Sequence, residues 1–343
     1  MKKVLSLILV AVMILSIGLT GCAPKEEQPA PGGDQGGQSQ EKVTLKFSTT
    51  TADTSTWTLG AKKFGELISE KTNGRIEVKV YPNDQLSGGN QSKGIEMLMS
   101  GSTDITFHSN IIYSVMDERF GVISLPFLIN DTETADNVLS GEGGEAINKI
   151  LLEKNIVGLG FGENGFRQLT NNVKPVESPA DMSGLKLRIP GIKMFISLYK
   201  ALGADPITMN FGEVFTSLQQ GTIDGQENPT DVISSSKINE VQKYMTVWDY
   251  SYDAIIFGMN KDKFESFSAE DQELIREAAK EACEYQRQIN REAAATQTQE
   301  FIDGGMEVNV LTSEQKAAFK EAVQPVYTEY EPIMGKELID AFR

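Results

Sequence analysis

The sequence predicts an α/β protein built from two domains with a cleft between them. Its 343 residues exceed the ~250–300 residues at which a single hydrophobic core stops growing. Strand-like and helix-like patterns alternate from residue 43 to residue 161, as they do where crossover helices join parallel strands. A helical pattern from Ser268 to about Ile302 would be about 50 Å long, so we expect this C-terminal helix to pack against both domains.

The first region opens with a β-α-β pattern. Val43, Leu45 and Phe47 alternate with polar residues as in a strand, and helical spacing follows until Asn73-Gly74. An alternating run at 76–80 then predicts a second strand, which we expect to pair parallel to the first. The patterns that follow predict strands at 101–107 and 156–161 and helices at 95–99 and 134–154.

The second region repeats this alternation. Its patterns predict strands at 185–189, 244–252 and 254–259 and helices at 195–202, 211–220 and 230–241. We expect the strand at 254–259 to return to the first domain. After the long helix, a short strand at 308–311 and a final helix beyond residue 313 close the chain. We therefore assign residues 42–165 and 254–293 to the first domain, and 166–253 and 294–343 to the second.

The N-terminus has the pattern of a lipoprotein signal peptide over residues 1–21. Lys2 and Lys3 precede an apolar run at 4–15, which is shorter than the ~20 residues that a membrane-spanning helix needs. The following Leu-Thr-Gly-Cys22 has the form of a lipobox, so we expect lipidation of Cys22; the alternative is an ordinary signal peptide with a chance cysteine. Residues 22–41, rich in Pro, Gly and Gln, predict a flexible tether. The sequence thus predicts an extracytoplasmic protein with a lipid anchor, in the periplasm or at the outer face of the cytoplasmic membrane.

The charge of the chain argues against nucleic acid as a partner. Its formal net charge is −16, and removal of Lys2 and Lys3 with the leader would make it −18. Binding to phosphates needs a positive face instead. Cys283 is the one cysteine besides Cys22, so we expect no disulfide within the chain and interpret Cys283 as a buried, inert thiol.

The sequence offers few residues for catalysis or metal binding. His108 is the only histidine, which leaves few candidates for a catalytic triad or a zinc site. The chain contains neither the dinucleotide-binding fingerprint nor the phosphate-binding loop. Asp224 and Glu227 could form a catalytic carboxylate pair, but surface or capping roles are favoured because no activated nucleophile lies nearby in sequence. We therefore expect no enzymatic activity, no metal and no cofactor.

Two arginines in apolar surroundings predict a pocket for a small carboxylate. Arg188 alternates with apolar residues just before Pro190, which places its guanidinium at the carboxyl end of a strand, where open α/β sheets bind ligands. Such a planar group can hold a carboxylate by two parallel hydrogen bonds. Arg167 also follows a predicted strand and can point into a crevice, and Asn228 brings both a donor and an acceptor. The alternative for each arginine is a solvated surface position.

Further candidate ligand contacts are aromatic and polar residues in predicted loops and at strand ends. They are Asp53, Trp57, Asn90, His108, Phe211, Trp248 and Asp249. Spacing alone equally allows Phe211 and Trp248 to be core side chains. His108 could instead be a hydrogen-bonded residue at the end of its strand.

From residue 43 to the C-terminus the chain resembles the substrate-binding proteins of tripartite ATP-independent periplasmic (TRAP) transporters, of the dicarboxylate-binding-protein (DctP) type. Each motif alone is weak, but their order along one chain is specific. The motifs are FxEL at 64–67, TNGR at 72–75, QL at 85–86, LPFL at 125–128, GFR at 165–167, GLKLR at 184–188, LGA at 202–204 and LQQGTIDGQENP at 218–229.

The resemblance implies a type II periplasmic-binding-protein-like fold that closes on its ligand like a hinged clamp, with the long helix spanning both domains. It implies that Arg188 binds the ligand carboxylate, with Arg167, Phe211 and Asn228 as a second basic contact, an apolar wall and an amide contact. It also implies a membrane permease with a small and a large subunit as partner. We expect the receptor to be a monomer.

The family often has a histidine near position 248, where this chain has Trp248-Asp249-Tyr250. Aromatic rings beside an acid favour a ligand with hydroxyl groups, so a sugar acid such as a hexuronate is our preferred ligand. A C4-dicarboxylate or a 2-oxo acid is the alternative. A ligand sensor for a signalling receptor is a second possible function, and an extracytoplasmic sugar-acid enzyme a third.

Overall fold

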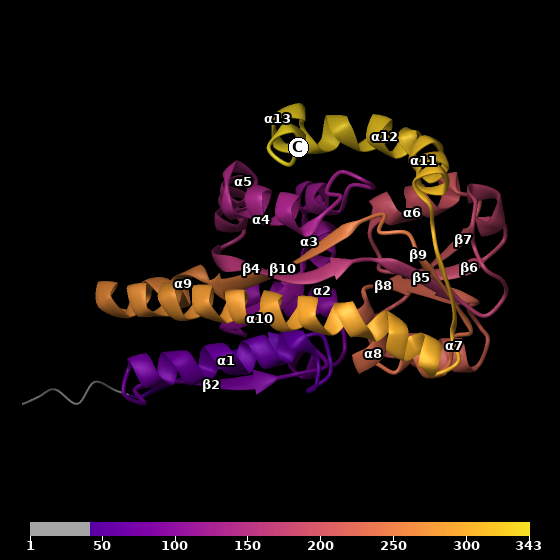
Figure 1. Cartoon of the computed structure of the whole chain (residues 1–343). Helices are drawn as coiled ribbons and strands as arrows, with labels where there is room; N and C mark the ends of the chain where they lie inside the picture. The colour runs from indigo at the N-terminus through magenta and orange to yellow at the C-terminus, as the bar shows by residue number, and fades with distance from the viewer. Residues whose placement is uncertain (1–41) are drawn as a thin grey trace, which may run out of the picture. The chain divides into compact units, whose positions relative to one another are not determined.

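The computed structural model describes residues 42–343, and this part of the chain forms one compact unit with two β-sheets (Figure 1). The predicted signal peptide at 1–21, Cys22 and the tether at 22–41 lie outside the described residues. Within residues 42–343, no helix combines the length and the apolar character needed to cross a membrane.

The first sheet has five strands in the order β2-β1-β3-β10-β4. Strand β1 pairs in parallel with both β2 and β3, which confirms the β-α-β unit predicted at the start of the chain. Strand β10 returns from the second region and pairs antiparallel with β3 and β4. The bounds are β1 Val43–Thr49, β2 Ile76–Tyr81, β3 Ile105–Ser109, β4 Ile156–Phe166 and β10 Tyr252–Asn260.

The second sheet has six strands in the order β11-β9-β5-β8-β6-β7. Strands β5, β7 and β8 were not predicted, because none of them shows an alternating apolar pattern. Strand β8 consists of glycine and polar residues, although all four of its residues are buried. The bounds are β5 Gln168–Asn171, β6 Lys186–Ile189, β7 Asp205–Thr208, β8 Gly225–Asn228, β9 Tyr244–Val247 and β11 Glu307–Val310.

Helices cover both sheets. Their bounds are α1 Thr56–Lys71, α2 Gln91–Met99, α3 Asn110–Met116, α4 Thr132–Ser140, α5 Glu142–Glu153, α6 Lys193–Ala201, α7 Val214–Gln219, α8 Thr230–Ser235, α9 Lys261–Glu265, α10 Ala269–Asp303, α11 Ser313–Ala322, α12 Gln324–Met334 and α13 Lys336–Asp340. Short 3₁₀ helices add η1 Gln85–Ser87, η2 Glu118–Ser124, η3 Pro179–Met182, η4 Phe211–Glu213 and η5 Ile238–Glu240.

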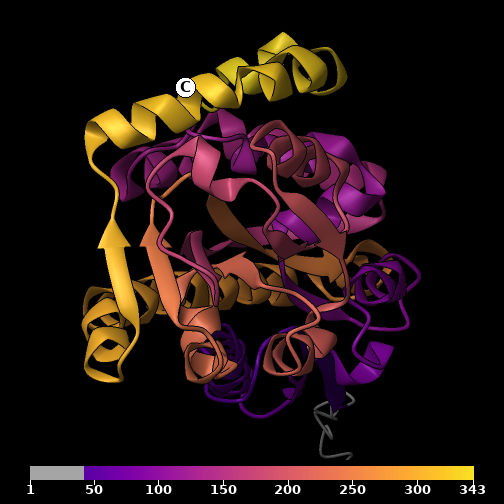
Figure 2. The ribbon, with the colours of Figure 1, turned by 90° about the vertical axis from the view of Figure 1, so that its right-hand side faces the viewer.

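Several predicted elements need correction. The strand predicted at 244–252 ends at Val247, and residues 248–251 lie outside the strands. The helix predicted at 134–154 is two helices, because the chain leaves helical geometry at Gly141 (φ −109°, ψ −145°). The helix at 211–220 begins as the 3₁₀ turn η4, and the helix at 230–241 is α8 followed by η5. The predicted final helix is a series of three helices, α11 to α13, which Figure 2 shows lying across one side of the molecule.

The long C-terminal helix is confirmed. Helix α10 begins after Ser268, whose hydroxyl accepts a hydrogen bond from the Asp271 backbone N–H at 3.1 Å, as expected of an N-cap. It contacts α1 and β4 beside the first sheet, then α8 and β11 beside the second, so it packs against both layers (Figure 1).

Two chain segments pass between the sheets and lie side by side. One leads from β4 to β5 through Arg167, and the other leads from β9 to β10 through residues 248–251. The Arg167 backbone N–H donates to the Ser251 carbonyl at 3.0 Å, which ties the two crossings together. The strands that carry the polar residues described next therefore converge at this junction.

Candidate functional site

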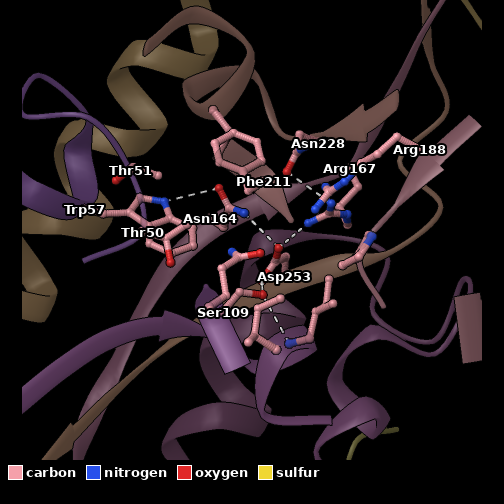
Figure 3. A pocket seen from close by; sticks show the side chains of 15 residues that line it. Thr50, Thr51, Trp57, Ser109, Asn164, Arg167, Arg188, Phe211, Asn228 and Asp253 are labelled. Atoms are coloured by element: carbon pink, nitrogen blue, oxygen red, sulfur yellow. Dashed lines mark hydrogen bonds and ion pairs between the residues drawn. The ribbon is translucent and has the colours of Figure 1, made fainter. Parts of the chain in front are cut away.

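A pocket lies beside this junction and is lined from both sheets (Figure 3). The first sheet and its helices contribute Thr50, Thr51, Trp57, Ser109, Asn164 and Asp253; the second contributes Arg188, Phe211 and Asn228; Arg167 comes from the crossing. The cavity that these side chains leave between them is small, about 30 Å³.

Arg188 is a buried cation, and not all of its hydrogen-bond donors are in use. It sits in β6 and is 2% exposed. Its Nε and Nη2 both donate to the Met209 carbonyl, at 3.1 and 2.9 Å, whereas Nη1 has no hydrogen-bond partner within residues 42–343. Burial lowers the pKa of Arg188 to about 10, with the Glu227 carboxylate opposing the decrease. The guanidinium is therefore still charged at neutral pH and available to an anion.

Phe211 forms a wall next to this cation. Its ring centroid lies 5.6 Å from the Arg188 guanidinium carbon, a distance at which the ring face attracts a cation. The ring and the Met209 carbonyl hold the guanidinium in place without neutralising it. A ligand carboxylate would supply the missing counter-charge.

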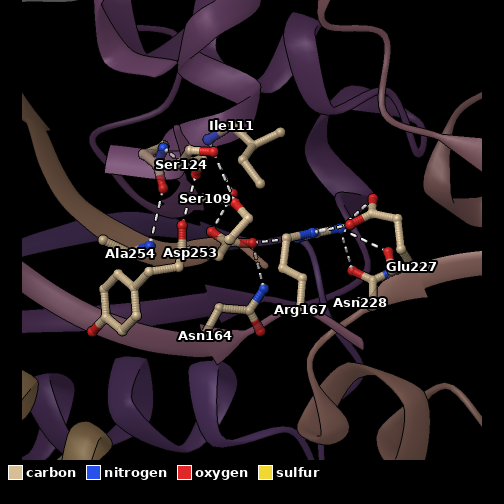
Figure 4. A network of polar contacts seen from close by, with 12 residues as sticks. Ser109, Ile111, Ser124, Asn164, Arg167, Glu227, Asn228, Asp253 and Ala254 are labelled. Atoms are coloured by element: carbon tan, nitrogen blue, oxygen red, sulfur yellow. Dashed lines mark hydrogen bonds and ion pairs between the residues drawn. The ribbon is translucent and has the colours of Figure 1, made fainter. Parts of the chain in front are cut away.

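Arg167 is buried as well, but its donors are largely occupied (Figure 4). Its Nε and Nη2 bind the two carboxylate oxygens of Glu227, and its Nη1 binds Asp253. Nη2 also donates to Asn228 Oδ1 at 3.1 Å. Burial by itself would lower the pKa of Arg167, but Glu227 and Asp253 hold it well above the ordinary value. Arg167 thus joins the two sheets as an ion-paired link.

Asp253 is the centre of a second set of polar contacts in the pocket wall. It is fully buried in β10 and accepts hydrogen bonds from Ser109 Oγ at 2.5 Å and Asn164 Nδ2 at 2.7 Å, besides that of Arg167. Asn164 Oδ1 in turn accepts from the Trp57 indole N–H at 3.3 Å. Burial raises the pKa of Asp253, and the arginine and the two neutral donors oppose that increase.

The pocket brings together five of the ten residues predicted as ligand contacts: Trp57, Arg167, Arg188, Phe211 and Asn228. Sequence reasoning missed Thr50, Thr51, Ser109, Asn164 and Asp253, which also line it. One signal could have found the last three. They are polar residues at or near the ends of apolar strands on the same side of the sheet, where α/β proteins bind ligands.

Trp248 and Asp249 lie outside the pocket. Trp248 is 1% exposed and stacks on Tyr250 with ring centroids 4.1 Å apart, inside the hydrophobic core. Asp249 forms an ion pair with Lys316 of α11 at 2.7 Å. The segment that was expected to identify the ligand instead joins the core to the C-terminal helices.

Asp53, Asn90 and His108 also lie outside the pocket lining. Asp53 is largely exposed and paired with Lys62 at 2.9 Å. Asn90 caps α2 through its side chain. His108 is fully buried, with Nε2 2.9 Å from the Asp84 carboxylate. His108 is therefore a hydrogen-bonded residue near the end of its strand, which was the alternative to a ligand contact.

A direct polar contact joins the two sides of the cleft near Trp57. Asp231, in the first turn of α8, accepts hydrogen bonds from Ser55 Oγ at 2.6 Å and from the Thr56 backbone N–H at 3.2 Å. These groups lie at the N-terminus of α1, which favours a negative charge. Asp231 is 4% exposed, and burial raises the pKa of its carboxyl group.

The raised pKa of Asp231 predicts a pH-dependent stability. Between the unfolded value of ~3.9 and the raised folded value, the native state binds more protons than the unfolded state. The contribution of Asp231 to stability is therefore lost as pH rises through this window. Asp231→Asn removes this loss, so the free energy of unfolding of the variant relative to the native chain should increase as pH rises above about 4, as measured by urea unfolding. The matched control is Asp205→Asn, an exposed carboxyl in β7, and an equal trend in both variants would contradict the prediction.

The sequence profile described as "Bacterial extracellular solute-binding protein, family 7" (DctP) matches residues 47–332 of this chain. The chain belongs to this family. Its members are periplasmic solute-binding receptors and not enzymes, which agrees with the predicted absence of a catalytic arrangement. Within residues 42–343, no group of three His, Cys, Asp or Glu side chains is placed to hold a metal ion.

Three relatives illustrate the similarity. The 2,3-diketo-L-gulonate-binding periplasmic protein YiaO of Escherichia coli is 35% identical over 281 residues, 81% of this chain and 84% of its own. The C4-dicarboxylate-binding periplasmic protein DctP of Rhodobacter capsulatus is 34% identical over 305 residues, 88% of this chain and 91% of its own. The sugar acid binding protein DctPAm of Advenella mimigardefordensis, solved with galactonate, has a TM-score of 0.84 and 32% identity, covering 88% of this chain and 98% of its own.

Proposed function

We propose that this receptor captures a small organic acid outside the cytoplasm and delivers it to a TRAP-type permease with a small and a large membrane subunit. The observation that carries the proposal is Arg188. It is a charged, buried guanidinium that lines the pocket between the two sheets and has no carboxylate partner within residues 42–343. Burying an unpaired charge is costly, so a bound carboxylate would complete the site.

The neighbouring residues would orient this carboxylate. Asn228 lines the pocket and is held by Arg167 and by Gln226, to which its amide donates at 2.6 Å. Phe211 would cover one face of the ligand. Arg167 would have a supporting role in carboxylate binding, because most of its hydrogen bonds go to Glu227 and Asp253.

Closure of two lobes around the ligand would couple binding to delivery. The proposed lobes are residues 42–165 with 254–293, and 166–253 with 294–343. Their hinge would be the two crossing segments at the junction together with α10. A ligand that contacts Arg188 on one side and the end of β1 on the other favours the closed form by its differential contacts. The Ser55–Asp231 hydrogen bond would then act as a latch of that form.

Our preferred ligand is a sugar acid such as a hexuronate. Two relatives support this class, since YiaO is a 2,3-diketo-L-gulonate-binding protein and DctPAm was solved with galactonate. A C4-dicarboxylate, as the name of DctP indicates for that relative, or a 2-oxo acid is the alternative. A receptor that presents its closed form to a signalling protein would have the same fold, and neighbouring genes for two membrane subunits would favour transport.

A thermal-shift screen over hexuronates, aldonates, 2-oxo acids and dicarboxylates tests the proposal. A ligand that binds the folded state stabilises it by RT ln(1 + [L]/Kd), so a true ligand raises Tm in a concentration-dependent way. Arg188→Ala should abolish the shift. If no acid raises Tm above the effect of salt alone, the proposed ligand class is wrong.

We also propose that the mature protein is anchored by lipid on Cys22, a residue outside the described part of the chain. Stable anchoring needs at least two acyl chains, so Cys22→Ala should move the protein from the membrane fraction to the soluble extracytoplasmic fraction. Labelling with a radioactive fatty acid provides the readout. Cys283→Ala is the control, because Cys283 is buried in α10, and labelling that persists in Cys22→Ala would contradict the anchor.

A further inference from the structure

The charges around the pocket accommodate one carboxylate. Three of the lining side chains are formally charged: Arg167, Arg188 and Asp253. Arg167 is paired with Asp253 and with the two oxygens of Glu227, so its positive charge is already compensated. Arg188 alone remains without a carboxylate partner among residues 42–343. The described residues thus provide one available counter-charge for an anionic ligand.

A second ligand carboxylate would meet a negative group or no counter-charge at all. Next to Arg167 it would compete with the Asp253 carboxyl group, which already accepts hydrogen bonds from Arg167, Ser109 and Asn164. Like charges placed side by side in a buried site cost several kcal/mol. The other polar lining residues are neutral hydroxyls and amides.

Two of these hydroxyls are buried without a partner. Thr50 and Thr51 follow β1 and are 6% and 1% exposed. Their Oγ1 atoms have no hydrogen-bond partner among the described residues, although both side chains line the pocket. Figure 3 shows them on the side of the pocket away from Arg188. Buried hydroxyls are nearly always hydrogen-bonded, so these two suit the hydroxyl groups of a ligand whose carboxylate is on Arg188.

We infer that the pocket selects polyhydroxylated monocarboxylates, the aldonate class, and that Asp253 excludes the corresponding dicarboxylates. In this arrangement Arg188 holds the single carboxylate, and Thr50 and Thr51 form a hydroxyl subsite at the other end. Asp253 is the specificity-determining residue, because its charge occupies Arg167 and repels a second carboxylate. The inference rests on the proposed function and narrows its ligand class.

The test compares matched pairs of ligands that differ only at the terminal carbon. An aldonate and the aldarate of the same configuration, such as galactonate and galactarate, share every hydroxyl up to a CH₂OH or a carboxylate at the end. Pairs of four to six carbons cover the possible ligand lengths. For the pair that fits, calorimetry should show the aldonate binding ~10–1,000-fold more tightly, the range that a like-charge contact implies.

Asp253→Asn should reduce this aldonate-to-aldarate ratio at least tenfold, because it removes the negative charge from the pocket wall. The ratio separates charge repulsion from a general loss of folding, which would weaken both ligands equally. Asp249→Asn is the matched control, since it removes a carboxylate four residues away that lies outside the pocket lining. An unchanged ratio in Asp253→Asn would overturn the role of Asp253.

The hydroxyl subsite has its own test. Thr50→Val and Thr51→Val keep the side-chain shape and remove the hydroxyls, so each should weaken the aldonate by about 5–30-fold, the equivalent of one hydrogen bond to a buried group. Ser48→Ala is the control, because its hydroxyl is also buried and unpartnered within the described residues but does not line the pocket. Equal aldonate affinity in all three variants would contradict the subsite.

The selectivity inference and the proposed function fail separately. If the native protein binds galactarate as tightly as galactonate, or prefers succinate or a 2-oxo acid, the receptor stands and the selectivity inference is wrong. If it binds no hexuronate, aldonate, 2-oxo acid or dicarboxylate, the proposed function itself is wrong.

Discussion

Replacing Arg188 by alanine is expected to weaken binding of the transported acid by roughly 30- to 5,000-fold, which corresponds to about 2–5 kcal/mol. The ligand carboxylate would remain buried beside Phe211 with its main partner removed. The variant should still fold, because the Arg188 guanidinium donates hydrogen bonds to a single group among residues 42–343, the Met209 carbonyl. Isothermal titration calorimetry on a folded variant measures the effect.

Arg188→Lys is the matched control for this prediction. It keeps the charge but loses the planar fork that can hold a carboxylate by two parallel hydrogen bonds. Its affinity should therefore lie between those of the native protein and the alanine variant. Near-native affinity in Arg188→Ala would mean that the carboxylate binds elsewhere.

Replacing Arg167 by methionine is expected to destabilise the fold itself by about 3–5 kcal/mol, because one partner of a buried ion-pair network is removed. Glu227 and Asp253 would be left fully buried without the cation that pairs with both of them. The measurement is the free energy of unfolding in urea, without ligand. The loss should be partly recovered in Arg167→Met combined with Glu227→Gln, which removes one of the two unpaired charges.

A less completely buried ion pair gives the contrast. Arg75 binds both carboxylate oxygens of Asp271 in α10, but its side chain is 23% exposed. Arg75→Met should cost ~1 kcal/mol or less, as expected for an ion pair near the surface. Equal costs for the two substitutions would show that Arg167 is not the structural link that its contacts indicate.

For Arg167 and Arg188, the sequence predicted the position of the side chain but not its ion pairing. Both were recognised because they stand among apolar residues at strand ends, and the structure places both at the pocket. Their different states were not visible in the sequence. Arg167 is compensated by Glu227 and Asp253, which lie 60 and 86 positions away in the chain, and no local pattern reports such pairings.

The fold was predicted best where hydrophobic periodicity is strong. The β-α-β start, β10 and the long helix α10 have clear apolar patterns and were recognised. Strand β8, Gly225–Asn228, was missed because it buries glycine and polar side chains, which hydrogen-bond to neighbouring strands and side chains. Strands are recognised in a sequence because their buried residues are usually apolar. Buried polar residues at a ligand site do not follow this pattern.

The aromatic segment after β9 lies away from the pocket lining. Trp248 and Asp249 were expected near the ligand from their chemical types, but the tertiary structure uses them elsewhere. Trp248 fills the core between Tyr199, Tyr250 and Phe319, and Asp249 anchors α11. Large aromatic side chains satisfy core packing and ligand walls equally well, so composition alone does not distinguish the two.

The most direct test of the account is a crystal structure of the protein with the acid that stabilises it most in the thermal-shift screen. We predict that the ligand carboxylate lies within hydrogen-bond distance of Arg188 Nη1, beside Phe211 and Asn228, with the ligand hydroxyls facing Thr50 and Thr51. A carboxylate bound away from Arg188, with the Arg188 guanidinium making no contact to the ligand, would contradict the central claim.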